Sequence, residues 1–141
     1  DGDVYFRYTE LFLILAEAAN EINGPDYEVM GMSARSIISA IRNRGGISPD
    51  NYIGSINTKE AMRELIRNER RIELSFEGHR FWDLRRWGLP LNETARGYSF
   101  DGSNYVEENV ESRNFPPFAT YMPIPNAETI KFPELEQNDR W

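Results

Sequence analysis

Acidic and basic side chains that could exchange protons are concentrated between residues 63 and 86. Within this segment Glu69, Glu73 and Glu77 recur at four-residue steps, so on a helix they lie along one ridge. A carboxylate of this ridge paired with His79 could act as a general acid and base. The alternative is that the helix-borne charges neutralise one another, and the interleaving of seven arginines with five carboxylates favours it. We therefore predict no catalytic residue and a structural ion-pair network made of Glu69, Arg70, Arg71, Glu73, Glu77, Arg80 and Asp83.

Aromatic side chains in the segment after residue 92 form a second candidate site. Tyr98, Phe100 and Tyr105 lie close in sequence to Asn104. Aromatic faces hold the C–H face of sugar rings, and amides bond to sugar hydroxyl groups. The prediction is that Tyr98, Phe100, Asn104 and Tyr105 contact a ligand. For most rings of this segment, which also include Phe115, Phe118 and Tyr121, packing of a long loop against helices is the stronger alternative.

The overall composition restricts the remaining functions. The chain has 141 residues, a net charge of −7 and 40% hydrophobic residues, which suits about one folded domain. An acidic chain repels phosphate backbones, so we predict no nucleic-acid partner. The sequence holds no cysteine and a single histidine, so we predict neither a metal site nor a cofactor. No apolar run reaches the ~18 residues that a membrane span needs.

Apolar periodicity predicts an antiparallel helix hairpin over residues 1–46. Its first helix is expected to have Asp3 as N-cap and to end before Gly24. Its second helix is expected from about Glu28 to Arg44, with a connection short enough to make the two helices neighbours. The predicted fold class is therefore all-α dominated.

A long third helix is predicted over residues 57–88, after a loop at 48–55. Asn57 is the expected cap, and Gly78 is expected to kink or break the helix because glycine costs about 1 kcal/mol relative to alanine in a helix interior. Residues 89–141 are predicted to form an irregular tail. Within the tail we expect strand-like pieces at 98–100 and 121–122, one helical turn at 127–130, and an ordinary turn at 101–104 in place of a calcium loop.

Three stretches resemble the SusD/RagB family. The first, residues 7–21, is similar to its R-Y-A-E-x-x-L-x-x-A-E-A-x-N helix. The second comprises residues 41–46 and 69–88, which are similar to the signatures R-x-R-x-G and E-R-R-x-E-L-x-F-E-G-x-R-x-x-D-L-x-R-W-G. The third comprises residues 123–125 and 133–138, which resemble the closing P-I-P and N-P-x-L-x-Q-N segments. The chain departs from these patterns at Thr9, at Phe132 and in its last three residues.

This resemblance implies a C-terminal module with tetratricopeptide-like helix pairs that carry irregular loops. Family members are several times longer, so the lipidated cysteine that anchors a member to the outer membrane would lie upstream of Asp1. The resemblance also implies that the charged signature residues 69–83 are scaffold ion pairs and not ligand contacts.

The implied function is non-catalytic capture of an oligosaccharide at the cell surface and its delivery to a SusC-like TonB-dependent transporter in the outer membrane. In this hypothesis the chain is mainly helical scaffold, and contact with the membrane is made only through the upstream lipid anchor. The alternative is a helical protein-interaction module that docks the transporter without touching the ligand.

Overall fold

The computed structural model describes residues 6–141, which form two compact units, one ending at Arg80 and the other beginning at Phe81. The described part contains six α-helices and two small antiparallel sheets, so the predicted all-α-dominated fold class is confirmed. The elements in chain order are α1 (Tyr8–Asn23), β1 (Glu28–Val29), β2 (Met32–Ser33), α2 (Ala34–Arg44), α3 (Asn51–Ser55), α4 (Lys59–Glu73), α5 (His79–Arg86), β3 (Ala95–Phe100), β4 (Tyr105–Glu111), the 3₁₀ helix η1 (Pro117–Thr120) and α6 (Asn126–Lys131).

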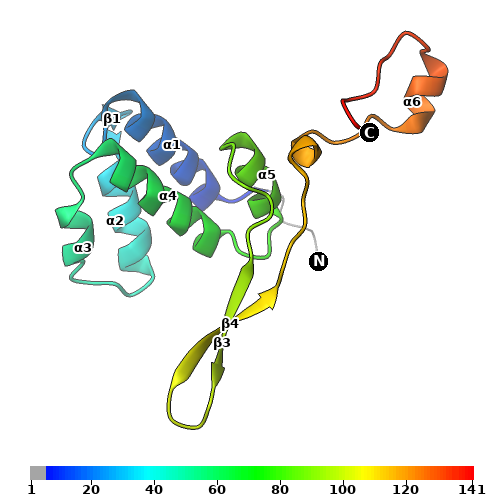
Figure 1. The fold of residues 1–141 in the computed structure, drawn as a ribbon. Helices are drawn as coiled ribbons and strands as arrows, with labels where there is room; N and C mark the ends of the chain where they lie inside the picture. Colours follow the sequence, from blue (N-terminus) through cyan, green and yellow to red (C-terminus); the bar gives the residue numbers. More distant parts are fainter. Residues whose placement is uncertain (1–5) are drawn as a thin grey trace, which may run out of the picture. The chain divides into compact units, whose positions relative to one another are not determined.

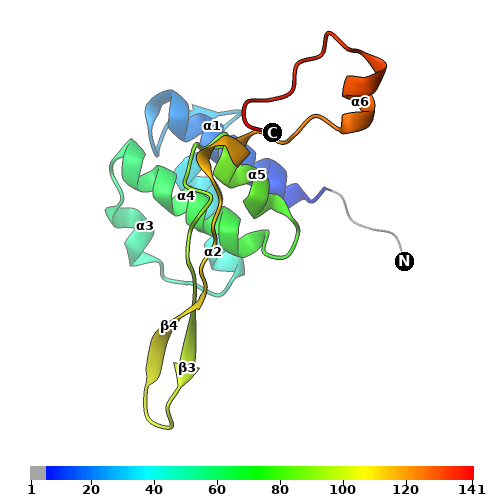
Figure 2. The same ribbon diagram turned by 45° about the vertical axis from the view of Figure 1, so that its right-hand side comes forward.

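The core of the first unit lies between α1, α2 and α4, which pack against one another in both views (Figures 1 and 2). Each helix contributes apolar side chains at helical spacing, and the largest fully buried ones are Leu13, Ile38, Met62 and Ile66. Asn20 is also fully buried, and its amide donates to the Lys59 carbonyl at 2.9 Å. This bond joins the end of α1 to the first turn of α4.

Helix α1 begins at Tyr8, later than the periodicity predicts, because Arg7 is already in an extended conformation. The expected N-cap, Asp3, lies outside the described residues. At the other end the helix stops before Gly24 as predicted, and the Gly24 N–H donates to the Asn20 carbonyl at 2.8 Å.

Helix α2 begins at Ala34, and the expected start near Glu28 is wrong. Met30 and Gly31 both have positive φ angles, 56° and 77°, which reverse the chain in a two-residue turn between β1 and β2. A helix cannot pass through such a turn. Ser33 then caps α2, because its hydroxyl accepts from the Ser36 N–H while the Ser36 hydroxyl accepts from the Ser33 N–H.

Two further boundaries differ from the sequence prediction. The expected loop at 48–55 contains the short helix α3, whose N-cap Asp50 accepts from the Ile53 N–H. The cap of α4 is Thr58 and not Asn57, since the Thr58 hydroxyl accepts from the Ala61 N–H at 3.2 Å.

The predicted helix over 57–88 is divided into α4 and α5. The break covers residues 74–78, where Phe76 and Gly78 have φ angles of 66° and 79°. Gly78 is thus a helix breaker, as its position suggested. Within the described residues, no helix is both long enough and apolar enough to cross a membrane.

The second unit carries the β3–β4 hairpin and a closing segment tied by side-chain amides. Gln137 bonds to both the N–H and the carbonyl of Ile124 at 2.8 Å, and Asn138 donates to the Met122 carbonyl at 2.6 Å. The Gln137 bonds join the two halves of the third sequence stretch, and the Asn138 bond joins it to the residue before. The helical turn expected at 127–130 is part of α6. The strand expected at 121–122 is wrong: Tyr121 is the C-cap of η1, and its N–H donates to the Phe118 carbonyl.

Candidate functional site

The β3–β4 hairpin is built around a four-residue turn at 101–104. The Asp101 carboxylate accepts from the N–H groups of Ser103 and Asn104, both at 2.8 Å, and the Asp101 N–H donates to the Asn104 carbonyl. The two accepted bonds hold the pKa of Asp101 below its usual value. The segment is therefore an ordinary Asx-type turn, as predicted, and it closes the hairpin at the Phe100–Tyr105 pair.

The register places three exposed aromatic rings on one face of the hairpin. Phe100 pairs with Tyr105 and Tyr98 pairs with Glu107, and directly paired residues of antiparallel strands share a face. The Phe100 and Tyr105 ring centroids are 5.2 Å apart and the rings are tilted by 49°. Tyr98, Phe100 and Tyr105 are 69%, 60% and 77% exposed. We call this surface the aromatic face; side-chain alternation assigns to it Arg96, Tyr98, Phe100, Tyr105, Glu107 and Asn109.

Three of the four predicted ligand residues thus come together on the aromatic face. The fourth, Asn104, lies in the turn, and its backbone takes part in the bonds to Asp101. Sequence reasoning missed Arg96, Glu107 and Asn109, which lie beside the rings. Recognising Tyr105–Val110 as a strand that pairs with 96–100 would have revealed them.

The opposite face of the hairpin has no aromatic ring and consists of small, aliphatic and acidic residues. A Cβ at Gly97 would lie 2.7 Å from the Val110 Cγ2 atom, so the Val110 side chain fills the space above this glycine. Ser99 and Val106 pair on the same side. Only the aromatic face therefore presents large ring surfaces.

The charged signature residues of α4 and of the turn after it bind arginines from distant segments. Glu69 accepts from Arg42 Nη1 at 2.6 Å, Glu73 from Arg44, and Glu77 from Arg7 Nη2 at 2.6 Å. Arg42 also pairs with Asp50, which keeps the pKa of Asp50 below its usual value. These long-range ion pairs join α4 and the following turn to α2, to the α3 N-cap and to the residue before α1.

The remaining residues of the predicted network occupy different places. Arg70 is buried, with Nη2 at 3.6 Å from Glu10 Oε1, and Asp83 accepts from Arg86 Nε at 2.8 Å. Arg71 lies on α4 and Arg80 on α5.

The single histidine lies near a carboxylate of α1 and not near the α4 ridge. His79 Nδ1 lies 3.6 Å from Glu10 Oε1, and this carboxylate also lies 3.6 Å from Arg70. Both Glu10 and Arg70 are buried. Between residues 6 and 141, no group of three or more acidic or histidine side chains is arranged to hold a metal ion.

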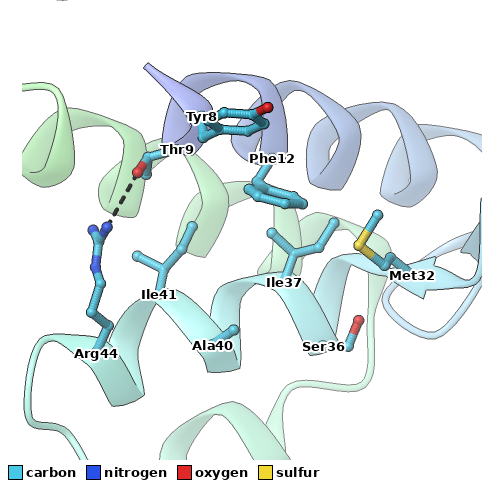
Figure 3. Close-up of a pocket in the computed structure, with 9 residues that line it drawn as sticks. All are labelled: Tyr8, Thr9, Phe12, Met32, Ser36, Ile37, Ala40, Ile41 and Arg44. Atoms are coloured by element: carbon cyan, nitrogen blue, oxygen red, sulfur yellow. Dashed lines mark hydrogen bonds between the residues drawn. The ribbon is translucent and has the colours of Figure 1, made fainter.

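A separate groove lies between α1 and α2 in the first unit. It has a volume of about 420 Å³ and a mainly apolar lining from both helices and β2. In Figure 3, Phe12 of α1 faces Ile37 and Met32 across the groove, and Arg44 closes one end by donating to the Thr9 hydroxyl at 3.3 Å. The groove has the apolar character of a docking surface.

The comparisons with known proteins agree on one family. The SusD family model matches residues 1–141. Two SusD-like proteins of Formosa agariphila, P25 and P2, are 30% and 31% identical to the chain and match 99% and 94% of it. A crystal structure of a SusD-like protein from Bacteroides fragilis is 33% identical, with a TM-score of 0.76 over 98% of the chain.

The match covers only part of each relative. It spans 24% of P25, 24% of P2 and 26% of the Bacteroides fragilis protein, so the chain corresponds to about a quarter of their length. The family model, the sequence identities and the shared fold are three concordant observations. The chain belongs to the SusD family.

Proposed function

We propose that the chain is part of a non-catalytic glycan-binding protein for nutrient uptake, and that the aromatic face contacts the oligosaccharide. The observation that carries this proposal is the grouping of Tyr98, Phe100 and Tyr105 on one exposed side of the hairpin. Exposed aromatic rings cost free energy in water, and stacking on a sugar ring removes them from it.

Hydrogen-bonding groups lie beside the rings. The tyrosine hydroxyls can donate and accept, the Asn109 amide can do both, and the Glu107 carboxylate accepts. Sugar hydroxyls need this combination of donors and acceptors at the edge of an apolar contact. The aromatic face therefore has the two kinds of contact that oligosaccharide binding requires.

The helices serve as the scaffold of this protein. Their charged residues join α4 and the turn after it to α2 and to Arg7 before α1, so the signature carboxylates are engaged in ion pairs within the scaffold. SusD-like proteins are generally binding proteins without catalysis. In the complete protein, we place the chain at the cell surface, in a lipoprotein of the outer membrane that hands the glycan to a SusC-like TonB-dependent transporter.

Titration of the intact protein with its glycan tests the role of the aromatic face. Tyr98→Ala, Phe100→Ala and Tyr105→Ala should each weaken binding by about tenfold, equivalent to ~1.4 kcal/mol, because each removes a stacking ring. Val106→Ala on the opposite face of β4 is the matched control and should leave the affinity unchanged. Unchanged affinity in all three ring variants would rule out this site.

A second function is favoured by the groove between α1 and α2. Its apolar lining suits a side chain or helix of another polypeptide, so the chain could dock the transporter while the glycan binds elsewhere. Retention of the transporter by the chain, with no glycan binding by the aromatic face, would favour this alternative.

A further inference from the structure

We infer that the aromatic face takes an uncharged stretch of oligosaccharide and discriminates against uronic-acid or sulfated sugars. This inference rests on the proposed function and concerns the chemistry of its ligand. It follows from the charges of the hairpin, which the ring residues alone do not reveal.

The hairpin is acidic and its cations are engaged. Residues 95–113 contain four carboxylates, at Asp101, Glu107, Glu108 and Glu111, against two arginines. Arg96 Nη1 lies 3.3 Å from the Glu107 carboxylate, and Arg113 Nε lies 3.7 Å from that of Glu111. After these pairs are formed, Asp101 and Glu108 contribute uncompensated negative charge.

The position of each charge determines what a bound sugar encounters. Glu107 and Arg96 lie on the aromatic face itself, beside Tyr98, and Asp101 lies in the turn next to Phe100. Glu108 lies on the opposite face. A sugar stacked on the rings therefore has an ion pair at one side and an ionised carboxylate at the end of the hairpin.

Anionic sugars need the opposite arrangement. Carboxylates and sulfates are bound by unengaged arginine or lysine side chains, usually through paired hydrogen bonds. Arg96 has further N–H donors, but its single positive charge is already balanced by Glu107, so an anionic sugar would add an uncompensated negative charge beside this pair. A neutral sugar adds no such charge, and its hydroxyl groups can donate to the Glu107 carboxylate.

Matched oligosaccharide probes test this inference on the intact protein. The first pair consists of β-1,4-manno-oligosaccharides and mannuronate oligosaccharides of equal length, and the second of β-1,4-gluco- and glucuronate oligosaccharides. A sulfated galactan oligosaccharide and its desulfated form make the third pair. In each probe pair that binds the protein, we expect the neutral oligosaccharide to bind about fivefold more tightly than the anionic one at low salt. This difference in affinity should shrink as added salt screens the charges.

Two isosteric variants, each of which removes one negative charge, locate the effect. Glu107→Gln removes a charge from the aromatic face and releases Arg96, so it should improve binding of the anionic probe about fivefold and bring the pair close to equal affinity. Glu108→Gln makes the same change of net charge on the opposite face and should have a smaller effect. Thermal melting of both variants checks that the hairpin remains folded.

The outcomes separate the inference from the function on which it rests. Preferential binding of the anionic members, lost in Tyr105→Ala, would overturn the inference and leave glycan capture by the aromatic face intact. Binding that is indifferent to Tyr98→Ala, Phe100→Ala and Tyr105→Ala, or no binding of any probe, would overturn both. A preference for the neutral probes, with binding weakened by Tyr105→Ala and the preference reduced by Glu107→Gln, supports both the inference and the proposed function.

Discussion

At the scale of single residues, Arg42 is a largely buried cation of the first unit that pairs with two carboxylates. Its guanidinium binds Glu69 on α4 and Asp50 at the N-cap of α3, and the three side chains are only 13%, 9% and 11% exposed. Burial of charges is tolerated when they are paired, whereas removal of one partner leaves the others without compensation. Arg42 therefore holds three elements together.

Replacement of Arg42 by methionine should lower the free energy of unfolding by about 3–5 kcal/mol, because Glu69 then lies buried without a cation. Chemical denaturation measures this change. Arg63→Met is the matched control on α4: its partner Glu21 is 38% exposed, and pairs at the surface contribute at most about 1 kcal/mol. Equal losses in the two variants would contradict the role given to Arg42.

The pH dependence of stability gives a second measurement of the Arg42–Asp50 ion pair. The pKa of Asp50 is lowered in the folded state by Arg42, so its contribution to stability is present above the unfolded-state pKa. This contribution is lost as the pH falls through the lowered folded-state pKa. The wild-type protein should therefore lose stability on acidification more steeply than Arg42→Met.

The sequence predicts these residues only in part. Helical spacing identified Glu69, Glu73 and Glu77 as members of a charged ridge, but it suggested partners within the same helix. The structure supplies Arg42, Arg44 and Arg7 from 27 to 70 residues away. Local periodicity contains no information on contacts at such separations, so the network became visible only with the packing of α1, α2 and α4.

At the scale of elements, boundaries depend on turn and cap chemistry more than on apolar periodicity. Met30 fits the apolar stripe of α2, yet its positive φ angle places it in a turn before the helix. The reciprocal Ser33–Ser36 hydrogen bonds fix the start of α2 four residues later than that methionine. Similarly, the two strands of the hairpin lack a strong apolar alternation, so β4 and half of the aromatic face could not be predicted from the sequence.

Ser33→Ala should lower the free energy of unfolding by about 1 kcal/mol, because the first turn of α2 loses its side-chain acceptor. Ser36→Ala removes the reciprocal bond, and Ser33→Ala with Ser36→Ala should cost less than the sum of the single variants. Denaturation of the three variants measures this coupling. Strict additivity would mean that the two hydroxyls do not act as one cap.

At the scale of the whole molecule, α1 has two apolar faces. One face packs in the core through Leu13, Ala16 and Ala19, all fully buried. The other is an outer stripe at helical spacing, which consists of Leu11, Ile14, Ala18 and Ile22; its three large side chains are 55%, 48% and 60% exposed. A surface helix normally has one apolar stripe and a polar opposite face, so a second apolar stripe indicates a further packing partner. Since the relatives are about four times as long as the chain, other parts of such a protein are available to cover the stripe.

The 141-residue chain on its own should therefore self-associate through the outer stripe, because exposed apolar patches above a few hundred Å² are rare on monomers. Leu11→Lys combined with Ile14→Lys should make it monomeric in sedimentation experiments, while the free energy of unfolding changes by less than about 0.5 kcal/mol per site. The control, Tyr52→Lys combined with Ile72→Lys, adds the same charge at exposed positions of α3 and α4 and should leave the association intact. A wild-type chain that is monomeric at high concentration and melts in one sharp transition would show that α1 needs no covering partner.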